Sequence, residues 1–289
     1  MPEIVFIVPA RKTDVLHRIL SMLSFQKDRG FRAVVADFTG DVDLASVVAE
    51  FESRIPVSCV PLGAAGEVLW KTCLDAVPSA EWICFLGSDV DFSAKSVRRM
   101  RRCIGDHPGY DVFHWNLEEP FRKYCLKTKP GKLFRKVFKD GAEAPLSSFV
   151  FRAQALREAL AADTEAAAMD FAVLLSAAKK TGIRTVRWER IGYRKPDTVT
   201  DPSLIEKEVR ERLMFFRWSE RFFGDDYPLG VGERLDLFAS ELVRLYPSYT
   251  PDDLKDDLNT FAVVNGPVRK MRASSALKAA LKVRRESLK

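Results

Sequence analysis

Two carboxylates stand directly after an apolar run in the first third of the chain. Residues 82–88 read Trp-Ile-Cys-Phe-Leu-Gly-Ser and are followed by Asp89 and Asp91, spaced i, i+2. Such a run is typical of a strand buried on both faces of a parallel sheet. Ligands bind at the carboxyl ends of such strands, where two carboxylates can hold a divalent cation and, through it, a diphosphate. The alternative is an Asp pair that caps the next helix, because residues 88–93 are rich in N-cap residue types.

The segments around this run alternate between strand and helix patterns. A first helix, which Asp14 would cap, is expected to run to about residue 27. Strands are expected at 4–8, 32–36, 57–61 and up to 88, and two further helices at 42–52 and 67–77. Because strands and helices alternate within 90 residues, the sequence predicts a parallel, Rossmann-like sheet with right-handed crossovers.

The middle of the chain continues this alternation around one basic stretch. Strands are expected at 111–115, 149–151 and 185–188, and helices at 153–160 and 166–180. Residues 121–139 hold eight Lys or Arg and no acid. Pro130 and Gly131 interrupt this stretch, so we expect a hairpin or a mobile loop. It would either close over phosphates, whose charge Lys and Arg neutralise, or be a solvated edge hairpin.

From residue 201 the pattern becomes helical. Helices are expected at 203–223, 234–246 and 252–264. The sequence therefore predicts two regions, an α/β domain over residues 1–200 and a helical C-terminal region with a basic tail over residues 201–289.

Composition limits the class of protein. The chain has 289 residues, of which 47% are apolar, and contains no run of about 20 apolar residues that a membrane helix needs. The first strand begins at Ile4 with no basic region before it, so no signal peptide is expected. Five cysteines without metal-ligand spacing indicate reduced thiols in a cytoplasmic protein.

The net charge of +6 is concentrated at the C-terminus. Residues 269–289 hold eight Lys or Arg and one Glu, which leaves the rest of the chain near neutrality. A nucleic-acid-binding face would be spread over the fold, so no nucleic-acid partner is expected. The tail also carries leucines among its basic residues, which permits a basic amphipathic helix on anionic lipid. A solvated, frayed helix is the alternative.

Several common motifs are absent. No G-x-G-x-x-G follows the first strand and no G-x-x-x-x-G-K-[ST] appears, so dinucleotide and P-loop sites lose their main support. The acidic residues at strand ends and at a late helix instead follow the order Asp37, Asp89 with Asp91, and Asp170. With the opening Ile-Val-Phe-Ile-Val-Pro-Ala-Arg over 4–11 and the Tyr-Arg pair at 193–194, residues 3–197 resemble the GT-A glycosyltransferases, especially family 2.

The resemblance implies a fold and a set of site residues. The fold would be a Rossmann-like GT-A fold with a mostly parallel central sheet and a helical C-terminal appendage. Asp89 and Asp91 would hold Mn²⁺ or Mg²⁺, and Asp170 would be the catalytic base, although an acid there also suits the helix dipole. Asp37 would contact the nucleobase, or merely cap a turn. The donor-binding residues would be Pro9, Ala10, Arg11, Asp37, Gly63, Lys71, Asp89 and Arg194.

The family pattern is altered at several positions. Gly87 stands where members commonly have the first Asp of an Asp-x-Asp element, and Met169 replaces the Glu that commonly precedes the catalytic Asp. Lys71, in place of an Asn, would either approach the donor phosphates or be a surface helix residue.

The function that this resemblance implies is inverting sugar transfer. The donor would be a nucleotide-diphosphate sugar such as a UDP-sugar, and the acceptor a glycan or lipid-linked molecule of polysaccharide biosynthesis. The protein would be cytoplasmic, with peripheral contact to the inner face of the membrane through residues 269–289. One alternative is a catalytically degenerate GT-A-like protein that binds a nucleotide-sugar or a partner. Another is a nucleotidyltransferase or a Rossmann-type binder that shares the same sheet. A nucleotidyltransferase would need a glycine-rich loop after the first strand, whereas residues 9–13 contain cations and no glycine.

Overall fold

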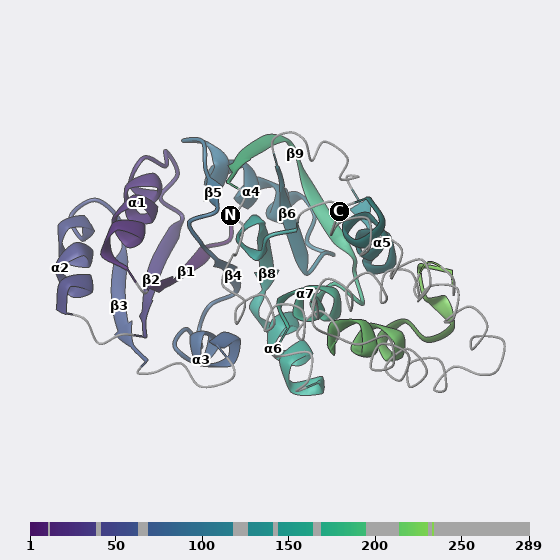
Figure 1. Ribbon diagram of the computed structural model, residues 1–289. Coiled ribbons are helices and arrows are strands. Elements are labelled where there is room, and N and C mark those ends of the chain that lie inside the picture. Colours follow the sequence, from purple (N-terminus) through teal and green to yellow (C-terminus); the bar gives the residue numbers. More distant parts are fainter. Residues whose placement is uncertain are drawn as a thin grey trace, which may run out of the picture. The chain divides into compact units, whose positions relative to one another are not determined.

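The structure, a computed structural model, describes residues 1–10, 12–38, 42–62, 69–117, 127–140, 144–163, 169–194, 214–230 and 233. The chain divides into two compact units (Figure 1). The first comprises Met1–Val137 and Gly141–Pro196, and the second comprises Phe138–Asp140 and Asp197–Lys289.

The first unit is built on a mixed sheet with the strand order β3-β2-β1-β4-β8-β6-β9-β5, and β7 pairs with β9. Strands β3, β2, β1 and β4 pair with one another in parallel, and β6 pairs in parallel with β9. Strands β5 and β7 pair antiparallel with β9. Strand β8 runs antiparallel between β4 and β6. The mostly parallel α/β sheet predicted from the sequence is therefore confirmed. The strands are β1 (Ile4–Ala10), β2 (Phe31–Asp37), β3 (Val57–Pro61), β4 (Trp82–Phe85), β5 (Val90–Asp91), β6 (Val112–Leu117), β7 (Lys127–Thr128), β8 (Phe149–Arg152) and β9 (Ile183–Tyr193).

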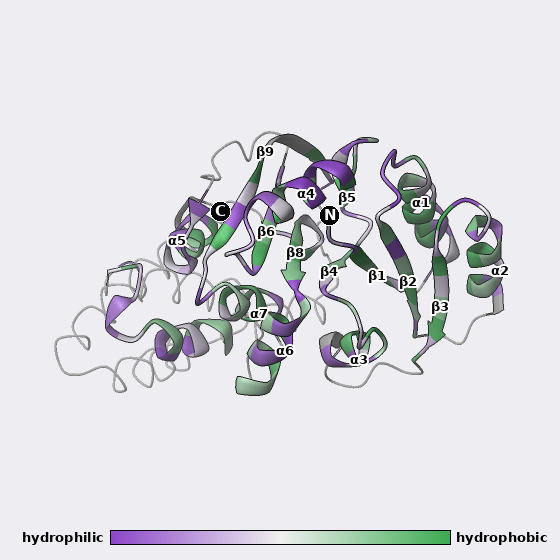
Figure 2. Cartoon of the chain, turned by 180° about the vertical axis from the view of Figure 1, so that it is seen from behind, coloured by the Kyte–Doolittle hydropathy of each residue, from purple (hydrophilic) through white to green (hydrophobic). Residues whose placement is uncertain are grey.

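Helices cover both faces of this sheet. Alternate residues of β1, such as Ile4, Phe6 and Val8, share a buried cluster with apolar residues of α1, α2 and α4, because side chains of a strand alternate between the two faces. Figures 1 and 2 show α3, α6 and α7 gathered on the other side of the sheet. The helices are α1 (Thr13–Ser24), α2 (Val42–Phe51), α3 (Leu69–Asp75), α4 (Ser96–Asp106), α5 (Pro130–Asp140), α6 (Ala153–Ala162) and α7 (Asp170–Ala177), with the 3₁₀ turn η1 (Leu146–Ser148) before β8.

Two local predictions were wrong. The basic stretch 121–139 was expected to be a hairpin or a mobile loop, but its described part contains the strand β7 and the helix α5. Pro130 is the first residue of α5, where proline is favoured because its missing N–H is not needed. Asp14 does not cap α1, because the helix begins one residue earlier and its N-cap is Lys12.

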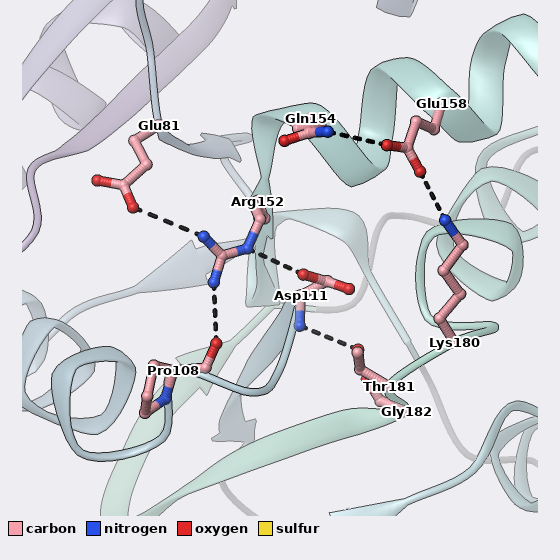
Figure 3. Close-up of polar contacts among 9 residues, drawn as sticks. All are labelled: Glu81, Pro108, Asp111, Arg152, Gln154, Glu158, Lys180, Thr181 and Gly182. Carbon is pink, nitrogen blue, oxygen red and sulfur yellow. Dashed lines mark hydrogen bonds and ion pairs between the residues drawn. The ribbon is translucent and has the colours of Figure 1, made fainter.

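A polar network joins three strands at the edge of the sheet where β4 and β6 begin (Figure 3). Arg152, the last residue of the antiparallel β8, pairs with Asp111 at 2.9 Å and with Glu81 at 3.6 Å. Its guanidinium also donates to the Pro108 carbonyl at 3.0 Å and lies over the Trp82 ring, 4.5 Å from the centroid. This arrangement holds the starts of β4 and β6 in register with the end of β8.

The second unit contains a helical segment over residues 214–223, followed by a 3₁₀ turn (Gly224–Asp226). Aromatic side chains hold it together, with Trp218 stacked on Phe222 at 4.7 Å between ring centroids. The segment agrees with the end of the helix expected at 203–223. The helices expected at 234–246 and 252–264 and the basic tail lie outside the described residues. Among the described helices, none is long and apolar enough to cross a bilayer.

Candidate functional site

The carboxyl ends of the parallel strands form one edge of the sheet. The register pairs Ala10 at the end of β1 with Asp37 at the end of β2, and Asp37 with Pro61 at the end of β3. Pro9, Ala10 and Asp37 therefore lie along the edge at which β4 leads into Asp89. The Asp37 side chain is buried, and its charge, together with the larger effect of burial, raises the pKa of the neighbouring Cys59 thiol.

Asp89 is held in the turn between β4 and β5. The hydroxyl of Ser147, in η1, lies 2.7 Å from each carboxylate oxygen of Asp89 and donates to the pair. Burial raises the pKa of Asp89, while the Ser147 hydrogen bond and the Arg18 charge lower it. Arg18 comes from α1 and donates to the carbonyl of Ser88. The carboxylate is thus partly desolvated and held by Ser147, while Arg18 holds the backbone carbonyl of the preceding residue.

Gly87 leaves the space that this carboxylate occupies. A Cβ atom at Gly87 would lie 2.6 Å from an Asp89 carboxylate oxygen, closer than side chains normally approach. The carboxylate of Asp89 therefore folds back over the position at which the family commonly has its first acidic residue. A side chain at residue 87 would displace Asp89 from Ser147.

Asp91 lies in β5 and is paired across the sheet with β9. The register places Asp91 opposite Gly192, and Arg194 donates to an Asp91 carboxylate oxygen at 3.0 Å. The backbone N–H of Arg194 also donates to the carbonyl of Asp89 at 2.7 Å. Both side chains of the pair are more than half exposed.

The helix-cap alternative for this Asp pair is wrong. Helix α4 begins only at Ser96 and has Lys95 as its N-cap residue. The turn before it is closed by Ser93, whose carbonyl accepts from the N–H of Ser96. Asp89 and Asp91 therefore lie too early in the chain to cap α4.

Asp170 lies at the start of a helix that packs against the turn η1. It is the first residue of α7, its side chain is exposed, and its neighbour Met169 is buried in the N-cap position without a side-chain capping bond. Helix α7 packs against η1, the turn that supplies Ser147.

Three predicted residues are not part of this cluster as described. Lys71 is exposed in the first turn of α3. Arg11 and Gly63 lie outside the described residues. The residues that sequence reasoning did not connect to Asp89 are Ser147 and Arg18. Nothing in the pattern around either one signals the contact, because both are about 60 to 70 residues from the turn that they hold.

The cysteine beneath Asp89 belongs to the core. Burial, and to a smaller extent the charge of Asp89, raises the pKa of the Cys84 thiol well above its ordinary value. The thiol lies 3.7 Å from the Ser147 carbonyl oxygen. A thiol held neutral in this way is a poor nucleophile, so Cys84 supports the site by packing.

The oxygen groups present suit a hard divalent cation. Among the described residues, no group of three or more His, Cys, Asp or Glu side chains could hold a metal by itself. Mg²⁺ and chemically similar ions are usually held by one or two carboxylates, with substrate phosphates and water completing the shell. Asp89 and Asp91 fit that description.

Comparisons with known proteins identify the fold. No family model and no curated protein matches the sequence. Solved structures do match. Staphylococcus aureus TarS in complex with UDP aligns with a TM-score of 0.62 and 11% identity, covering 99% of this chain and 92% of TarS 1–349. The same protein in complex with UDP-GlcNAc gives a TM-score of 0.58 and 13% identity, covering 97% of this chain and 81% of that one.

A mannosyltransferase from Pyrobaculum calidifontis, in complex with GDP-Man and Mn²⁺, also matches. Its TM-score is 0.57 and its identity 14%, covering 97% of this chain and 86% of the mannosyltransferase. The protein therefore has a divergent GT-A-like fold. At these identities, the likeness establishes the architecture, and the chemistry has to be argued from the site.

Proposed function

We propose that the protein is an inverting glycosyltransferase that moves a sugar from a nucleotide-diphosphate donor, a UDP-sugar, to a glycan or lipid-linked acceptor. The observation that carries this proposal is the Asp89 carboxylate, held by Ser147 at the carboxyl edge of a GT-A-like sheet. The solved structures with similar folds contain UDP, UDP-GlcNAc or GDP-Man, which supports a nucleotide-sugar donor.

The donor would lie along the strand-end edge. Asp37, at the end of β2, accepts a hydrogen bond from the imide N–H of the base, which favours uracil. Pro9 and Ala10, at the end of β1, and Arg11, the next residue in the sequence, would contact the nucleotide. Gly63 and Lys71 lie on the segment that follows β3 and contribute to the same donor site.

The diphosphate would lie at the turn that follows β4. Asp89 and Asp91 would hold Mn²⁺ or Mg²⁺, which supplies charge neutralisation at the departing diphosphate when bound. Arg194 binds Asp91 at 3.0 Å and is placed to exchange this carboxylate for a phosphate oxygen. An arginine can bind either group through two parallel hydrogen bonds.

The acceptor would be activated by Asp170. Inversion requires a base that takes the proton of the acceptor hydroxyl as the new bond forms on the opposite side from the leaving group. An exposed carboxylate at the first position of α7, on a helix that packs against η1, is available to an acceptor that enters beside Asp89.

Calorimetry with nucleotides tests the donor site. We expect UDP to bind in the presence of Mn²⁺, more tightly than GDP, and NAD not to bind. Asp89→Ala with Asp91→Ala should abolish this binding, while Glu158→Ala, which removes an exposed carboxylate of α6, should leave it unchanged. The absence of nucleotide binding under every condition would overturn the proposal.

A second candidate is a degenerate GT-A-like protein that binds a nucleotide-sugar or a partner without transfer. Two observations favour it: Gly87 has no acidic side chain, and Asp91 is already paired with Arg194. Binding of UDP without hydrolysis of any UDP-sugar, and without transfer to any acceptor, would support this candidate.

The protein is proposed to act in the cytoplasm. Its basic tail over residues 269–289 is proposed to touch the inner face of the membrane, where lipid-linked acceptors of polysaccharide biosynthesis would be available.

A further inference from the structure

The outer face of α4 is strongly basic. Lys95, Arg98, Arg99 and Arg102 follow the spacing i, i+3, i+4, i+7, which places them on one side of a helix, and all four are exposed. The opposite side of α4 is apolar and buried through Val97, Met100 and Ile104. Figure 2 shows α4 as a strongly hydrophilic helix beside the N-terminus.

The loop that follows α1 is attached to the start of α4. The side-chain amide of Gln26 donates to the Ser93 carbonyl at 2.9 Å and accepts from the N–H of Val97 at 3.2 Å. The N–H of Lys27 donates to the Ala94 carbonyl at 2.9 Å. This loop therefore brings the exposed side chains of Lys27 and Arg29 close to the four basic residues of α4. Together these six cations form the α4 basic face.

Two described acids lie next to this face in the sequence, Asp28 and Asp106. Asp28 is paired with Arg101, and both side chains are largely buried. Arg101 also donates to the carbonyls of Met1 and Pro2, at 3.0 and 2.6 Å. Its guanidinium therefore binds groups within the fold and is not counted in the α4 basic face. Asp106 is the one exposed acid among the described residues of α4.

An exposed aromatic residue stands beside the α4 basic face. Phe25 directly precedes Gln26, and 75% of its surface is exposed, as is 76% of Met1. Among the described residues, the remaining exposed large apolar side chain is Met214, which is 42% exposed. An exposed aromatic side chain next to clustered Lys and Arg fits the boundary between lipid headgroups and acyl chains.

We propose that the α4 basic face, with Phe25, is a docking surface for an anionic lipid membrane. The cations bind acidic headgroups, and Phe25 inserts among them. This inference is independent of the sugar-transfer chemistry and of the tail at 269–289. Because Lys95 lies four residues after Asp91, docking through this face would keep the candidate site near the lipid surface.

Vesicle flotation with the full chain tests the proposal. We expect binding to vesicles of phosphatidylglycerol and phosphatidylcholine, no binding to phosphatidylcholine alone, and loss of binding at high salt. Arg98→Gln with Arg102→Gln should weaken binding roughly 25-fold, since each basic residue near the surface contributes about a factor of five. Phe25→Ser should weaken it about tenfold, and Phe25→Trp should preserve it.

Matched variants separate this surface from a general charge effect. Arg98→Lys with Arg102→Lys keeps the charge and should keep the binding. Lys179→Gln with Lys180→Gln removes the same charge in the exposed turn that follows α7 and should also keep the binding. Circular dichroism and thermal unfolding verify that each variant is folded.

Three results would overturn the proposal: no binding to anionic vesicles, binding that Arg98→Gln with Arg102→Gln leaves intact, or binding insensitive to Phe25→Ser. Binding to single-stranded DNA or heparin that exceeds binding to the vesicles would also overturn it, in favour of a polyanion partner. None of these results depends on nucleotide binding, so failure here is distinct from failure of the proposed transfer.

Discussion

The Ser147 hydroxyl lies 2.7 Å from both carboxylate oxygens of Asp89, although 58 residues separate them in the chain. One residue comes from the turn η1 before β8, and the other from the turn after β4. Because β8 pairs with β4 in the sheet, the contact depends on the antiparallel insertion that distinguishes this sheet from an all-parallel one.

Removal of this hydroxyl should change the pH dependence of donor binding. Burial raises the pKa of Asp89, and the Ser147 hydrogen bond opposes that rise. Ser147→Ala should therefore raise the pKa further, and the protonated carboxyl cannot hold a cation. The acid limb of Mn²⁺-dependent UDP binding should move to higher pH, with roughly 10-fold weaker binding on that limb.

The neighbouring serine provides the control for this measurement. Ser148 donates its hydroxyl to the Pro145 carbonyl at 2.6 Å within η1, so Ser148→Ala should leave the acid limb in place. Ser147→Thr keeps the donor and should restore the wild-type profile. If Ser147→Ala weakens binding equally at every pH, the hydroxyl does not act through the carboxylate of Asp89.

The two basic residues of Figure 3, Arg152 and Lys180, should differ sharply in their contribution to the free energy of unfolding. Arg152 contacts Asp111, Glu81, the Pro108 carbonyl and the Trp82 ring. Arg152→Ala leaves Asp111, which is 20% exposed, without that partner. We expect a loss of about 2–3 kcal/mol in the free energy of unfolding, measured by urea denaturation.

The exposed pair in the same view is the comparison. Lys180 and Glu158 lie 2.8 Å apart, with side chains 77% and 49% exposed. Water screens such a pair, so Lys180→Ala should not change the unfolding midpoint measurably. Equal effects of Arg152→Ala and Lys180→Ala on the free energy of unfolding would show that the Arg152 contacts stabilise the fold no more than an exposed ion pair does.

The sheet could be predicted because its signals are local. Apolar runs of strand length, separated by helical patterns, identified β1 to β4, and for β3 the predicted bounds agree with the structure. The helix α5 was missed because Pro130 and Gly131 suggest a break, whereas a proline at the first helical position is favourable. A proline is therefore compatible both with a break in a helix and with the first residue of a helix. The tertiary packing of the neighbouring turns decides which of the two forms.

The candidate site was predictable only in part. Asp89, Asp91 and Asp37 could be located because each follows an apolar run, and strand ends meet at one edge of a sheet. The contacts of Ser147 and Arg18 could not, because they depend on which strand lies beside β4 and on how α1 packs over the sheet. Tertiary contacts of this kind leave no periodic pattern in the chain.

His114 should make the stability of the fold depend on pH. It lies within β6, fully buried, 4.5 Å from Phe149 between ring centroids, and burial lowers its pKa from 6.5 to about 3. In the unfolded chain the imidazole titrates near 6.5. Between these values the unfolded state binds the additional proton, so acid favours unfolding.

The expected slope follows from this difference in proton binding. The contribution of the neutral His114 imidazole to the free energy of unfolding is fully present above pH 6.5. It is lost as the pH falls toward 3, by up to about 1.4 kcal/mol per pH unit. Urea denaturation across this range should give a shallower slope for His114→Phe than for the wild type. An unchanged slope in His114→Phe contradicts the prediction.

Asp170 decides between an enzyme and a binding protein. If Asp170 is the base for the acceptor hydroxyl, Asp170→Asn should lower turnover by about 10² to 10⁴. The affinity for UDP with Mn²⁺ should stay within experimental error, because the donor residues lie on other elements. Parallel measurement of transfer and of calorimetric binding separates these two effects, and Asp75→Asn, an exposed acid at the end of α3, is the control.

The competing role for this residue predicts a different result. An acid in the first turn of α7 interacts favourably with the helix dipole and stabilises the fold by about 0.3–1 kcal/mol. If that is its whole contribution, Asp170→Asn should lower the unfolding temperature slightly and leave turnover near the wild-type value. Loss of turnover in a variant that keeps both its unfolding temperature and its UDP affinity would assign the proton transfer to Asp170. Retained turnover would place the base elsewhere.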